Sequence, residues 1–511
     1  MSIFVYASNK ERKEKIKELC AHVFESEKKI EEYTFHKIGN NILIIDNNEV
    51  CNFVGITLNN LKNVYLYEQN QIFSLIKDEA KLLAQRKQYI TEKHWDAAKK
   101  INDVILNSDF LLRRSKPSGF PDYLQIETTS NCNAECIMCS HYYTKNRNTS
   151  YLSKSIIEKL SDTLPYTRVV SINGGGEPFI NPHISSQIEE FVKFGAKISS
   201  TTNLSFINDT LISHINSHFI SLQLSCDGAT KETYELIRKN LSFEFFLKNL
   251  SLLQEKCPEI DKYFVTVIMR QNIRELPDIV DIAGRAGIKK AIFMNINTNP
   301  IIANEHDSMR NYPTILYYYL NKVKKIGEHF GIKIIAPPYN ELLEMTEFSR
   351  ELELLNSKPM IKSNDEFVQM LMATEKLEPY IYKNIFPREK PKKSTVKCTG
   401  ICDWLLRRAY ISSYGDVSIC CINMAFHCGN VNKLGSFQNV WSSDYYQNIR
   451  DIFYSGYLPD CCLGCGLIEQ ENFMYLKIEI TDDFYQESEY KKTRNRKTQE
   501  LLTNPLNGNG G

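Results

Sequence analysis

The stretch NCNAECIMC, residues 131–139, decides which fold and chemistry this chain is expected to have. It directly follows a strand-like run, Tyr123–Thr129, and three and then two residues separate its successive cysteines. Thiolates at this spacing can reach one metal centre from a single loop, and three of them leave one coordination position open, as a catalytic iron–sulfur centre needs. For this triple alone, a structural zinc site completed by a residue such as His141, or unligated core cysteines, remain alternatives.

Around this stretch, short β-branched runs alternate with amphipathic helical stretches. The expected strands are Tyr123–Thr129, Arg168–Ile172, Lys197–Thr202, Phe219–Ser225, Tyr263–Arg270 and Ala291–Asn297. The expected helices are Lys154–Leu164, Ile184–Phe194, Asn208–His218, Phe243–Glu255 and Leu276–Ala286. This alternation predicts an α/β fold with a parallel sheet covered by helices, either doubly wound or curled toward a barrel.

The unusual residues of this region follow the expected strands. Asn173–Pro178 reads NGGGEP after the second strand, Thr201–Asn203 ends the third, and Ser225–Gly228 reads SCDG after the fourth. Ligands bind at the carboxyl ends of the strands in both candidate architectures. We therefore expect these segments and the cysteine stretch to meet at one edge of the sheet.

Composition limits what kind of protein this is. The chain has 511 residues, 42% of them hydrophobic, and a formal net charge of +1. This length allows about three domains, and the near-zero charge provides no global field that would attract nucleic acid. Only Ile3–Ala7 is apolar before the N-terminal charges begin, so we expect a cytoplasmic protein that binds no membrane. In the cytoplasm, the 15 cysteines are expected to be thiols or metal ligands rather than disulfides.

The pattern predicts five consecutive parts. The first, 1–112, should be a small α/β module with a helical connection, without the hairpin and three helices of a winged helix. The core should span 120–336, followed by a connecting segment, 337–397. A second cysteine-rich domain should span 398–480, and 481–511 should be a disordered tail.

The cysteine triple, the Gly-Gly-Glu-Pro motif and the Ser-x-Asp-Gly motif together resemble the radical S-adenosylmethionine (radical SAM) superfamily over about residues 120–300. The resemblance implies a partial (β/α)6, TIM-like barrel. It also implies that Cys132, Cys136 and Cys139 hold a 4Fe-4S cluster whose open iron binds S-adenosylmethionine. The reduced cluster would donate one electron, cleave the carbon–sulfur bond, and so release methionine and a 5′-deoxyadenosyl radical. That radical would remove a hydrogen atom from a substrate carbon.

The resemblance assigns cofactor contacts to the second and third strand ends. Gly175, Gly176 and Glu177 match the motif that receives the methionine amino group. Glycine allows the backbone to approach the ligand, and a carboxylate accepts hydrogen bonds from an ammonium group. Thr202 and Asn203 are similar to the polar wall of the cofactor site in that superfamily.

Further cofactor contacts are implied near the fourth strand and in the cysteine stretch. Ser225 and Asp227 lie where the superfamily contacts the ribose. Arg238 matches a position that often pairs with the cofactor carboxylate, although a solvated helix charge is the alternative. Met138 stands where an aromatic residue is common, and its thioether could lie against adenine.

A second cysteine window resembles the SPASM/twitch extension of radical SAM enzymes over about 70 residues. Its features are Cys402, a Gly415 turn, Cys420 and the pair Cys462 and Cys465. The resemblance implies one auxiliary 4Fe-4S cluster bound by these four thiolates, with Cys398, Cys421 and Cys461 left over. Four thiolates would leave no iron open, which implies a role in electron transfer. A structural zinc ribbon is the alternative.

These features imply a radical SAM oxidoreductase, or a peptide- or sugar-modifying enzyme, that performs oxidation, epimerisation or cross-linking. We favour a carbohydrate-like metabolite over a peptide as substrate, because residues 1–85 show no winged-helix pattern. A reducing partner such as flavodoxin or ferredoxin is implied, and no residue acting on the substrate can be named. The alternative is a non-enzymatic electron carrier, redox sensor or zinc-stabilised scaffold, which would not need Glu177, Ser225 and Asp227 at the strand ends.

Overall fold

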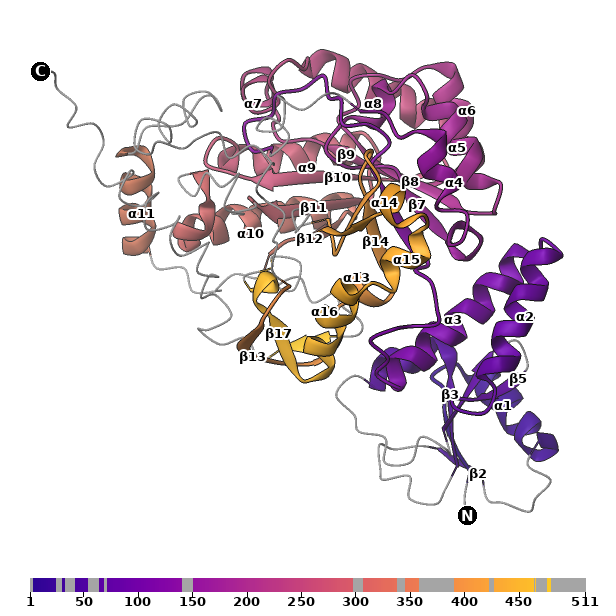
Figure 1. The fold of residues 1–511 in the computed structure, drawn as a ribbon. Helices are drawn as coiled ribbons and strands as arrows, with labels where there is room; N and C mark the ends of the chain where they lie inside the picture. Colours follow the sequence, from indigo (N-terminus) through magenta and orange to yellow (C-terminus); the bar gives the residue numbers. More distant parts are fainter. Residues whose placement is uncertain are drawn as a thin grey trace, which may run out of the picture.

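The structure is a computed structural model of the chain, and the part of the chain that it describes forms three β-sheets. The residues it describes are 3–23, 30–32, 42–53, 64–68, 71–139, 150–296, 307–337, 345–357, 390–421, 427–463, 465 and 476–478. A five-stranded sheet lies near the N-terminus, a ten-stranded sheet forms the centre, and a three-stranded sheet lies below it in Figure 1. The first cysteine cluster follows a strand of the ten-stranded sheet, whereas the second cysteine window spans parts of the ten-stranded and the three-stranded sheets.

The N-terminal module is a small α/β unit, as the sequence predicts. Its strands are β1 (Ile3–Tyr6), β2 (Ile30–Glu32), β3 (Ile42–Asp46), β4 (Val64–Glu68) and β5 (Gln71–Ser74). They lie in the order β2-β1-β3-β4-β5, and all neighbours are parallel except β4 and β5. Helix α1 (Lys10–Val23) follows β1. A mainly parallel sheet differs from a winged helix, in agreement with the sequence pattern.

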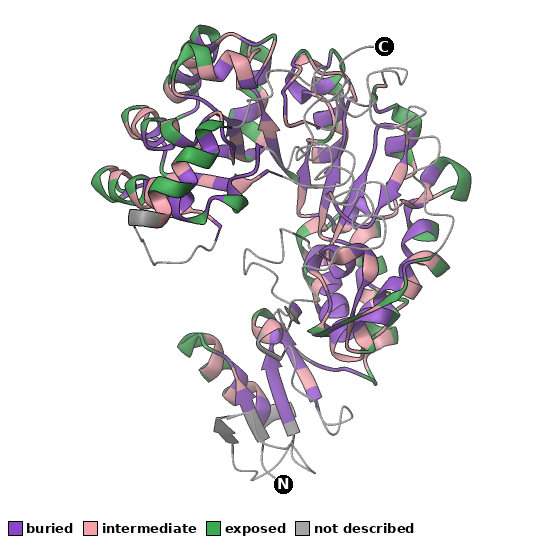
Figure 2. Ribbon diagram, turned by 90° about the vertical axis from the view of Figure 1, so that its left-hand side faces the viewer, coloured by how far each residue is buried: buried purple, intermediate pink, exposed green. Residues whose placement is uncertain are grey.

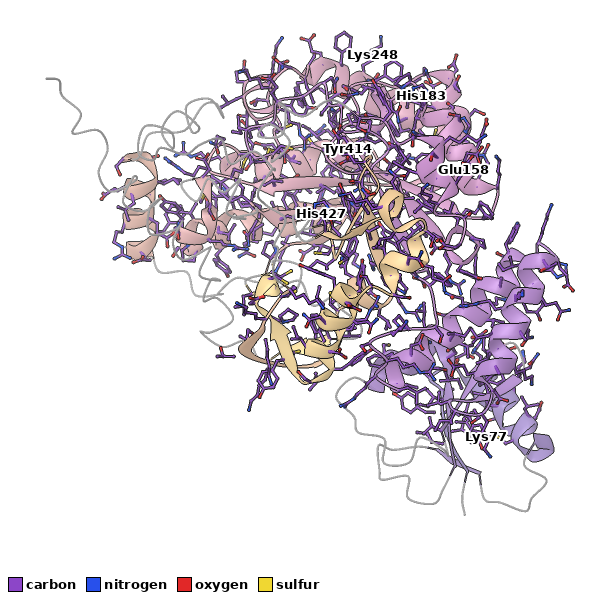
Figure 3. The ribbon with its side chains drawn as sticks, in the orientation of Figure 1. Lys77, Glu158, His183, Lys248, Tyr414 and His427 are labelled. Carbon is purple, nitrogen blue, oxygen red and sulfur yellow. The ribbon has the colours of Figure 1, made fainter. Side chains whose placement is uncertain are left out.

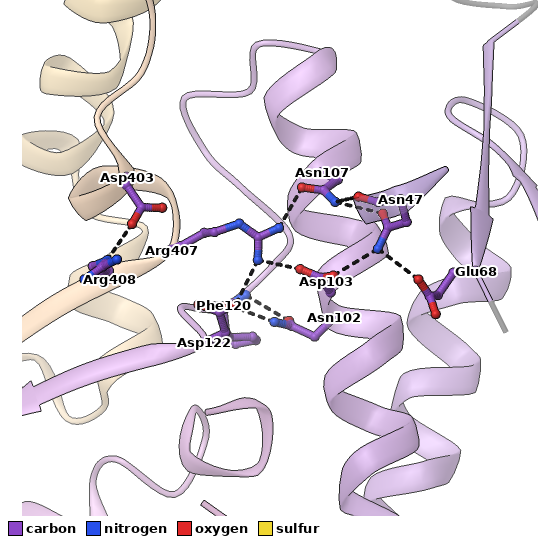
Figure 4. A network of polar contacts seen from close by, with 10 residues as sticks. All are labelled: Asn47, Glu68, Asn102, Asp103, Asn107, Phe120, Asp122, Asp403, Arg407 and Arg408. Atoms are coloured by element: carbon purple, nitrogen blue, oxygen red, sulfur yellow. Dashed lines mark hydrogen bonds and ion pairs between the residues drawn. The ribbon is translucent and has the colours of Figure 1, made fainter. Parts of the chain in front are cut away.

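Arg407 takes part in a polar network between the N-terminal part of the chain and the rest of the molecule (Figure 4). Helices α2 (Glu79–Thr91) and α3 (Trp95–Leu111) follow the module, and Asp103 and Asn107 lie on α3. Arg407 donates to Asp103, to Asp122 at 2.8 Å and to Asn107 at 2.6 Å. Asn47, which follows β3, donates to Asp103 at 2.9 Å. Burial raises the pKa of Asp122, and the positive charge of Arg407 opposes that shift.

The centre of the molecule is the predicted partial barrel. Its parallel strands are β6 (Tyr123–Ile126), β7 (Val169–Ser171), β8 (Lys197–Thr202), β9 (Phe219–Ser225), β10 (Asp261–Ile268), β11 (Lys290–Asn295) and β12 (Lys333–Ile335). Its helices are α4 (Lys154–Glu158), α5 (Ile184–Val192), α6 (Asp209–His218), α7 (Lys231–Ile237), α8 (Phe243–Lys256), α9 (Leu276–Arg285) and α10 (Pro313–Phe330). Each strand pairs in parallel with its neighbours in sequence. The six predicted strands are confirmed, whereas β12 and α7 were not predicted.

Helices cover one face of this sheet (Figures 1 and 2). Alternate strand residues such as Leu124 and Ile126 are fully buried, and they belong to the same apolar core as Ile188 and Phe191 of α5. The intervening residues point to the opposite, inner face, because successive side chains of a strand alternate. Strand positions thus divide into an apolar half under the helices and a polar half on the inside of the barrel.

The central sheet continues beyond β6 with strands from the C-terminal region. β14 (Arg408–Ile411) pairs in parallel with β6, and Tyr410 stands opposite Gln125. β15 (Asp416–Ser418) and β16 (His427–Asn430) extend the sheet in antiparallel pairing. The expected domain 398–480 therefore shares a sheet with the core. The sequence did not predict this pairing, because β6 and β14 are far apart along the chain.

Further elements surround these strands. The three-stranded sheet has the order β17 (Tyr457–Pro459), β13 (Lys393–Gly400) and β18 (Leu476–Ile478). Helix α16 (Asp444–Tyr454) contacts this sheet, whereas α13 (Asp403–Leu406) contacts β14, and α14 (Val431–Leu434) and α15 (Phe437–Trp441) contact β16. Helix α11 (Met345–Ser357) lies in the expected connecting segment, and the expected tail 481–511 lies outside the described residues. Among the helices described, none has the length and apolar character needed to span a membrane.

Replacing Arg407 by alanine should lower the free energy of unfolding by roughly 3–5 kcal/mol, because two largely buried carboxylates would lose their counter-charge. Urea unfolding followed by circular dichroism measures this loss. Arg285→Ala is the matched control, since Arg285 forms an exposed pair with Asp281 at 2.6 Å and its loss should leave the urea midpoint unchanged. Equal midpoints for the two variants would contradict a stabilising role for Arg407.

Candidate functional site

The cysteine loop (residues 131–139) lies directly against the glycine loop (residues 173–178). The backbone N–H of Glu177 donates to the carbonyl oxygen of Asn131 at 2.8 Å. A Cβ atom on Gly176 would lie 2.3 Å from that oxygen and 2.4 Å from the carbonyl oxygen of Thr129. Backbone atoms in such a position cannot yield, so only glycine permits this contact. Gly176 is therefore required by the cysteine loop itself, in addition to any contact it makes with a ligand.

The end of α7 holds the cysteine loop from another side. The backbone N–H of Ile137 donates to the carbonyl of Ile237 at 3.0 Å, and that of Glu135 donates to the carbonyl of Lys239 at 2.9 Å. The expected meeting of strand ends is thus observed, and the helix after β9 takes part as well.

The Cys132 and Cys136 thiols of this loop lie in surroundings that favour their neutral, protonated form. Burial raises the pKa of Cys132 and of Cys136 to about 12. Metal binding would displace the protons that such thiols otherwise keep. Across the described part of the chain, no three His, Cys, Asp or Glu side chains are placed to hold a single metal ion.

An arginine lies beside this loop. Arg238 pairs with Asp227 at 2.6 Å, and its Nη1 lies 4.0 Å from the sulfur of Cys136. Asp227 also accepts the backbone N–H of Val267 at 2.7 Å. Burial lowers the pKa of Arg238, but Asp227 and further ionisable neighbours such as Cys136 together outweigh burial and raise the pKa overall. The Nε of Arg238 is buried and has no hydrogen-bond partner among the described residues. The alternative of a solvated helix charge is therefore wrong for Arg238.

Glu177 is buried and surrounded by hydrogen-bond donors. Its carboxylate accepts the hydroxyl of Thr202 at 2.7 Å, the N–H of Asn203 at 2.7 Å and the N–H of Phe179 at 3.1 Å. Burial raises the pKa of Glu177, and these hydrogen bonds oppose the shift. Thr202 and Asn203 thus orient Glu177.

The remaining predicted cofactor residues lie around the same edge. The side-chain amide of Asn203 donates to Asn133 of the cysteine loop at 3.0 Å, so it ties β8 to that loop. Ser225 ends β9 and is buried. Met138 packs against an apolar cluster that includes Ile237 and Met269. The sequence predicted the neighbourhood of these residues but missed their contacts with one another.

The second cysteine window brings several thiols together. Burial raises the pKa of Cys402 well above its usual range, and nearby Cys462 and Cys465 raise it further. Burial raises the pKa of Cys421 to about 12, and Cys465 also contributes. Cys420 lies in the hydrophobic core and is 8% exposed. Cys402, Cys462 and Cys465 are therefore neighbours, and Cys421 competes with the predicted Cys420 as a fourth ligand.

Comparisons with known proteins agree with this geometry. A family model described as the radical SAM superfamily matches residues 126–283. A second model, SPASM, described as an iron–sulfur cluster-binding domain, matches residues 402–466. The chain carries a radical SAM domain and a SPASM domain.

Individual relatives are distant from this chain. Mycofactocin maturase MftC of Mycobacterium ulcerans (strain Agy99) is 28% identical over 169 residues, which cover 33% of this chain and 45% of that protein. The chain thus spans less than half the length of this relative. A tungsten-containing aldehyde ferredoxin oxidoreductase cofactor-modifying protein of Pyrococcus furiosus is 22% identical, covering 69% of this chain and 89% of that protein. Streptococcus suis SuiB bound to S-adenosylmethionine has a TM-score of 0.46 and 16% identity, covering 76% of this chain and 83% of its own.

The two domains imply S-adenosylmethionine and 4Fe-4S clusters as cofactors. The residues present fit these groups. Cys132, Cys136 and Cys139 supply thiols in one buried loop, and the buried Nε of Arg238 lacks a hydrogen-bond partner within the described chain, as expected beside a bound anion. No disulfide joins the described cysteines, so all of them remain available as thiols.

Sequence reasoning missed Glu127 in this radical SAM domain. Glu127 directly follows β6 and contacts the glycine loop through Gly175, whose N–H it accepts at 2.7 Å. The sequence had extended the first strand through Thr129, which placed Glu127 inside a strand. A shorter strand would have put this carboxylate among the other polar strand-end residues.

Replacing Cys132, Cys136 and Cys139 together by alanine should reduce the iron content of the anaerobically reconstituted protein from about eight to about four atoms per chain. The auxiliary cluster would account for the remainder. Iron analysis beside protein quantification measures this change. Cys257→Ala is the control, because Cys257 is a buried thiol outside both windows and its loss should leave iron unchanged. Full iron retention in the triple variant would refute the assignment.

Gly176→Ala should cost the protein about half of its iron, because the new Cβ would push the cysteine loop away from its position. Gly331→Ala is a useful control. Gly331 has φ 65° at the end of α10 and a Cβ there would meet open space, so its substitution strains the backbone by about 1 kcal/mol without touching the site. Equal iron content in both variants would show that the close approach at Gly176 is not required.

Proposed function

We propose that this chain is a radical SAM enzyme that removes a hydrogen atom from a substrate carbon. The observation that carries this proposal is the meeting of the cysteine loop, the glycine loop and the end of β8 around the buried Glu177. When bound, the reduced cluster and S-adenosylmethionine supply the 5′-deoxyadenosyl radical, with methionine as the other product of the cleavage. An electron carrier or redox sensor would need the thiols but not the hydrogen-bond donors around Glu177, which therefore favour an enzyme.

Glu177 is suited to bind the amino group of S-adenosylmethionine. A carboxylate offers about four acceptor positions, and Thr202, Asn203 and Phe179 occupy three of them. These bonds fix the orientation of the carboxylate before a ligand arrives. The remaining position can accept a hydrogen bond from an ammonium group, whose positive charge would compensate the buried carboxylate.

Arg238 is suited to bind the carboxylate of S-adenosylmethionine. Its Nε needs a buried acceptor, and its Nη1 already lies 4.0 Å from Cys136. Asp227 holds Arg238 in place, so we assign Asp227 this positioning role in preference to the ribose contact that the sequence implied. Ser225, at the end of the same strand, remains the proposed ribose contact, and Met138 the proposed adenine contact.

The inner face of the barrel favours a neutral substrate rich in hydrogen-bonding groups. Five neighbouring strands each place one polar residue opposite the next at the same position in the sheet: Tyr410, Gln125, Ser171, Ser199 and Ser221. At the next level, Gln223 stands between Thr201 and Tyr263. All of these side chains offer hydroxyl, phenol or amide groups and none carries a charge at neutral pH. Such a surface matches a polyol or the amide groups of a peptide better than an ionic substrate.

The SPASM domain is proposed to carry an auxiliary cluster that transfers electrons. If four cysteines bind the cluster, no iron is left for the substrate, so the cluster would accept an electron from the substrate radical or relay one outward. A cytoplasmic flavodoxin or ferredoxin is the proposed partner that supplies reducing electrons.

Anaerobic reconstitution with iron and sulfide, followed by dithionite and S-adenosylmethionine, tests the proposed function. The wild-type protein should form 5′-deoxyadenosine, measured by liquid chromatography, and Glu177→Ala should weaken S-adenosylmethionine binding. Deuterium-labelled polyols and peptides should then reveal the substrate class through label in 5′-deoxyadenosine. Wild-type protein with a full complement of iron that forms no 5′-deoxyadenosine would refute the proposal.

Cys465→Ala should abolish substrate turnover and still allow reductive cleavage of S-adenosylmethionine, since that step needs only the cluster held by Cys132, Cys136 and Cys139. The variant should also be less stable, because a metal site that exists only in the folded chain stabilises the fold. Product analysis and 5′-deoxyadenosine formation in the same sample separate the two steps. Normal product formation by folded Cys465→Ala would exclude Cys465 as an essential ligand, and Cys461 would then be tested.

A further inference from the structure

Glu127 connects the glycine loop to the SPASM region. Its side chain is buried, and it stands where β6 ends beside β14. One carboxylate oxygen accepts the N–H of Gly175 at 2.7 Å and the hydroxyl of Tyr410 at 2.9 Å. The other oxygen accepts the hydroxyl of Ser413 at 2.7 Å and its N–H at 3.2 Å. Residues from two domains therefore donate hydrogen bonds to one carboxylate.

A backbone hydrogen bond connects the same two domains. The N–H of Glu127 donates to the carbonyl of Ile411, the last residue of β14, at 2.8 Å. A Cβ atom on Gly174 would lie 2.5 Å from the Cβ of Glu127, so the glycine loop lies in contact with this side chain. The turn between β14 and β15, in which Tyr414 is labelled in Figure 3, also contacts the radical SAM domain through Ser413, whose carbonyl accepts the hydroxyl of Ser150 at 3.4 Å. Movement of that turn would therefore move the carboxylate.

The hydrogen bonds define what Glu127 can do. Four donors occupy the acceptor positions of its carboxylate, so little capacity remains for a ligand. Bonds to an ionised acceptor are strong and directional, and a buried carboxylate that lost them would be destabilised. Glu127 is thus a positioning residue rather than a ligand-binding one.

We propose that Glu127 couples the SPASM domain to the S-adenosylmethionine site. Tyr410 and Ser413 position the carboxylate, and the carboxylate positions the N–H of Gly175 beside the residues that receive the cofactor. This inference rests on the proposed function for the identity of the ligand. Coupling between two sites is reciprocal, so the cofactor should stabilise the β14–β15 turn as much as that turn favours the cofactor.

Hydrogen–deuterium exchange on the wild-type holoenzyme tests the reciprocal effect. S-adenosylmethionine should slow exchange in residues 408–418, although the proposed cofactor contacts lie in other segments. Glu127→Gln, which keeps the shape but removes the charge, should reduce this protection. Unchanged exchange in residues 408–418 on saturation with S-adenosylmethionine would overturn the proposed coupling. Because this measurement needs only the wild-type protein, it decides the question even if a variant fails to fold.

Affinity measurements test whether the contacts of Tyr410 and Ser413 favour cofactor binding. Tyr410→Phe and Ser413→Ala each remove one hydrogen bond to an ionised group, so each should weaken S-adenosylmethionine binding by about tenfold in anaerobic calorimetry. Tyr446→Phe is the matched control. Tyr446 is a buried tyrosine of α16 whose hydroxyl donates to Ser418 at 3.2 Å, and its substitution should leave the affinity unchanged.

A merely structural role for these residues makes a different prediction. It would lower the unfolding temperature of Tyr410→Phe and Tyr446→Phe alike and leave cofactor affinity the same in both. That result would overturn the coupling and leave the proposed function standing. Failure of the wild-type holoenzyme to bind S-adenosylmethionine would overturn both. Combining Glu127→Gln with Tyr410→Phe should weaken binding by less than the product of the single effects, because both changes remove the same interaction.

Discussion

The parallel pairing of β14 with β6 is the constraint on which the arrangement of the two cysteine windows depends. Parallel strands end at the same edge of a sheet, so this pairing brings the turn after β14 to the edge where the cysteine loop and the glycine loop meet. Tyr410 stands opposite Gln125, and Glu127 follows two residues later, directly after the end of β6. The SPASM region is therefore a continuation of the barrel wall.

Buried charge at this edge is balanced in three different ways. Glu127 is surrounded by four hydrogen-bond donors from two domains. Glu177 has three donors and room for one more, and Asp227 pairs with Arg238 at 2.6 Å. An uncompensated carboxylate would be too costly in such surroundings, so these pairings limit which groups are available to a ligand. Glu177 and Arg238 retain capacity, whereas Glu127 and Asp227 orient other residues.

One guanidinium links the N-terminal part of the chain to both of the other regions, beside the apolar core that residues such as Leu43 and Leu66 share with the barrel. Arg407 contacts Asp103 of α3 and Asp122 before β6, and it directly precedes β14. The mainly parallel order of this module distinguishes it from a winged helix. Its carboxyl edge, which includes Asn47, faces α3, so the edge where parallel sheets usually bind ligands is engaged within the chain.

The sequence by itself determined the radical SAM core. Local alternation of strands and helices, and cysteine and glycine motifs at strand ends, depend on neighbours within a few residues and can be read along the chain. Tyr410 and Ser413 could not be found this way, since their contacts with Glu127 join segments more than 280 residues apart. The pairing of Asp227 with Arg238 was missed for a related reason, because motif resemblance names ligand contacts but not contacts between side chains. Only the tertiary structure decided these side-chain contacts, because long-range strand pairing sets which buried groups meet.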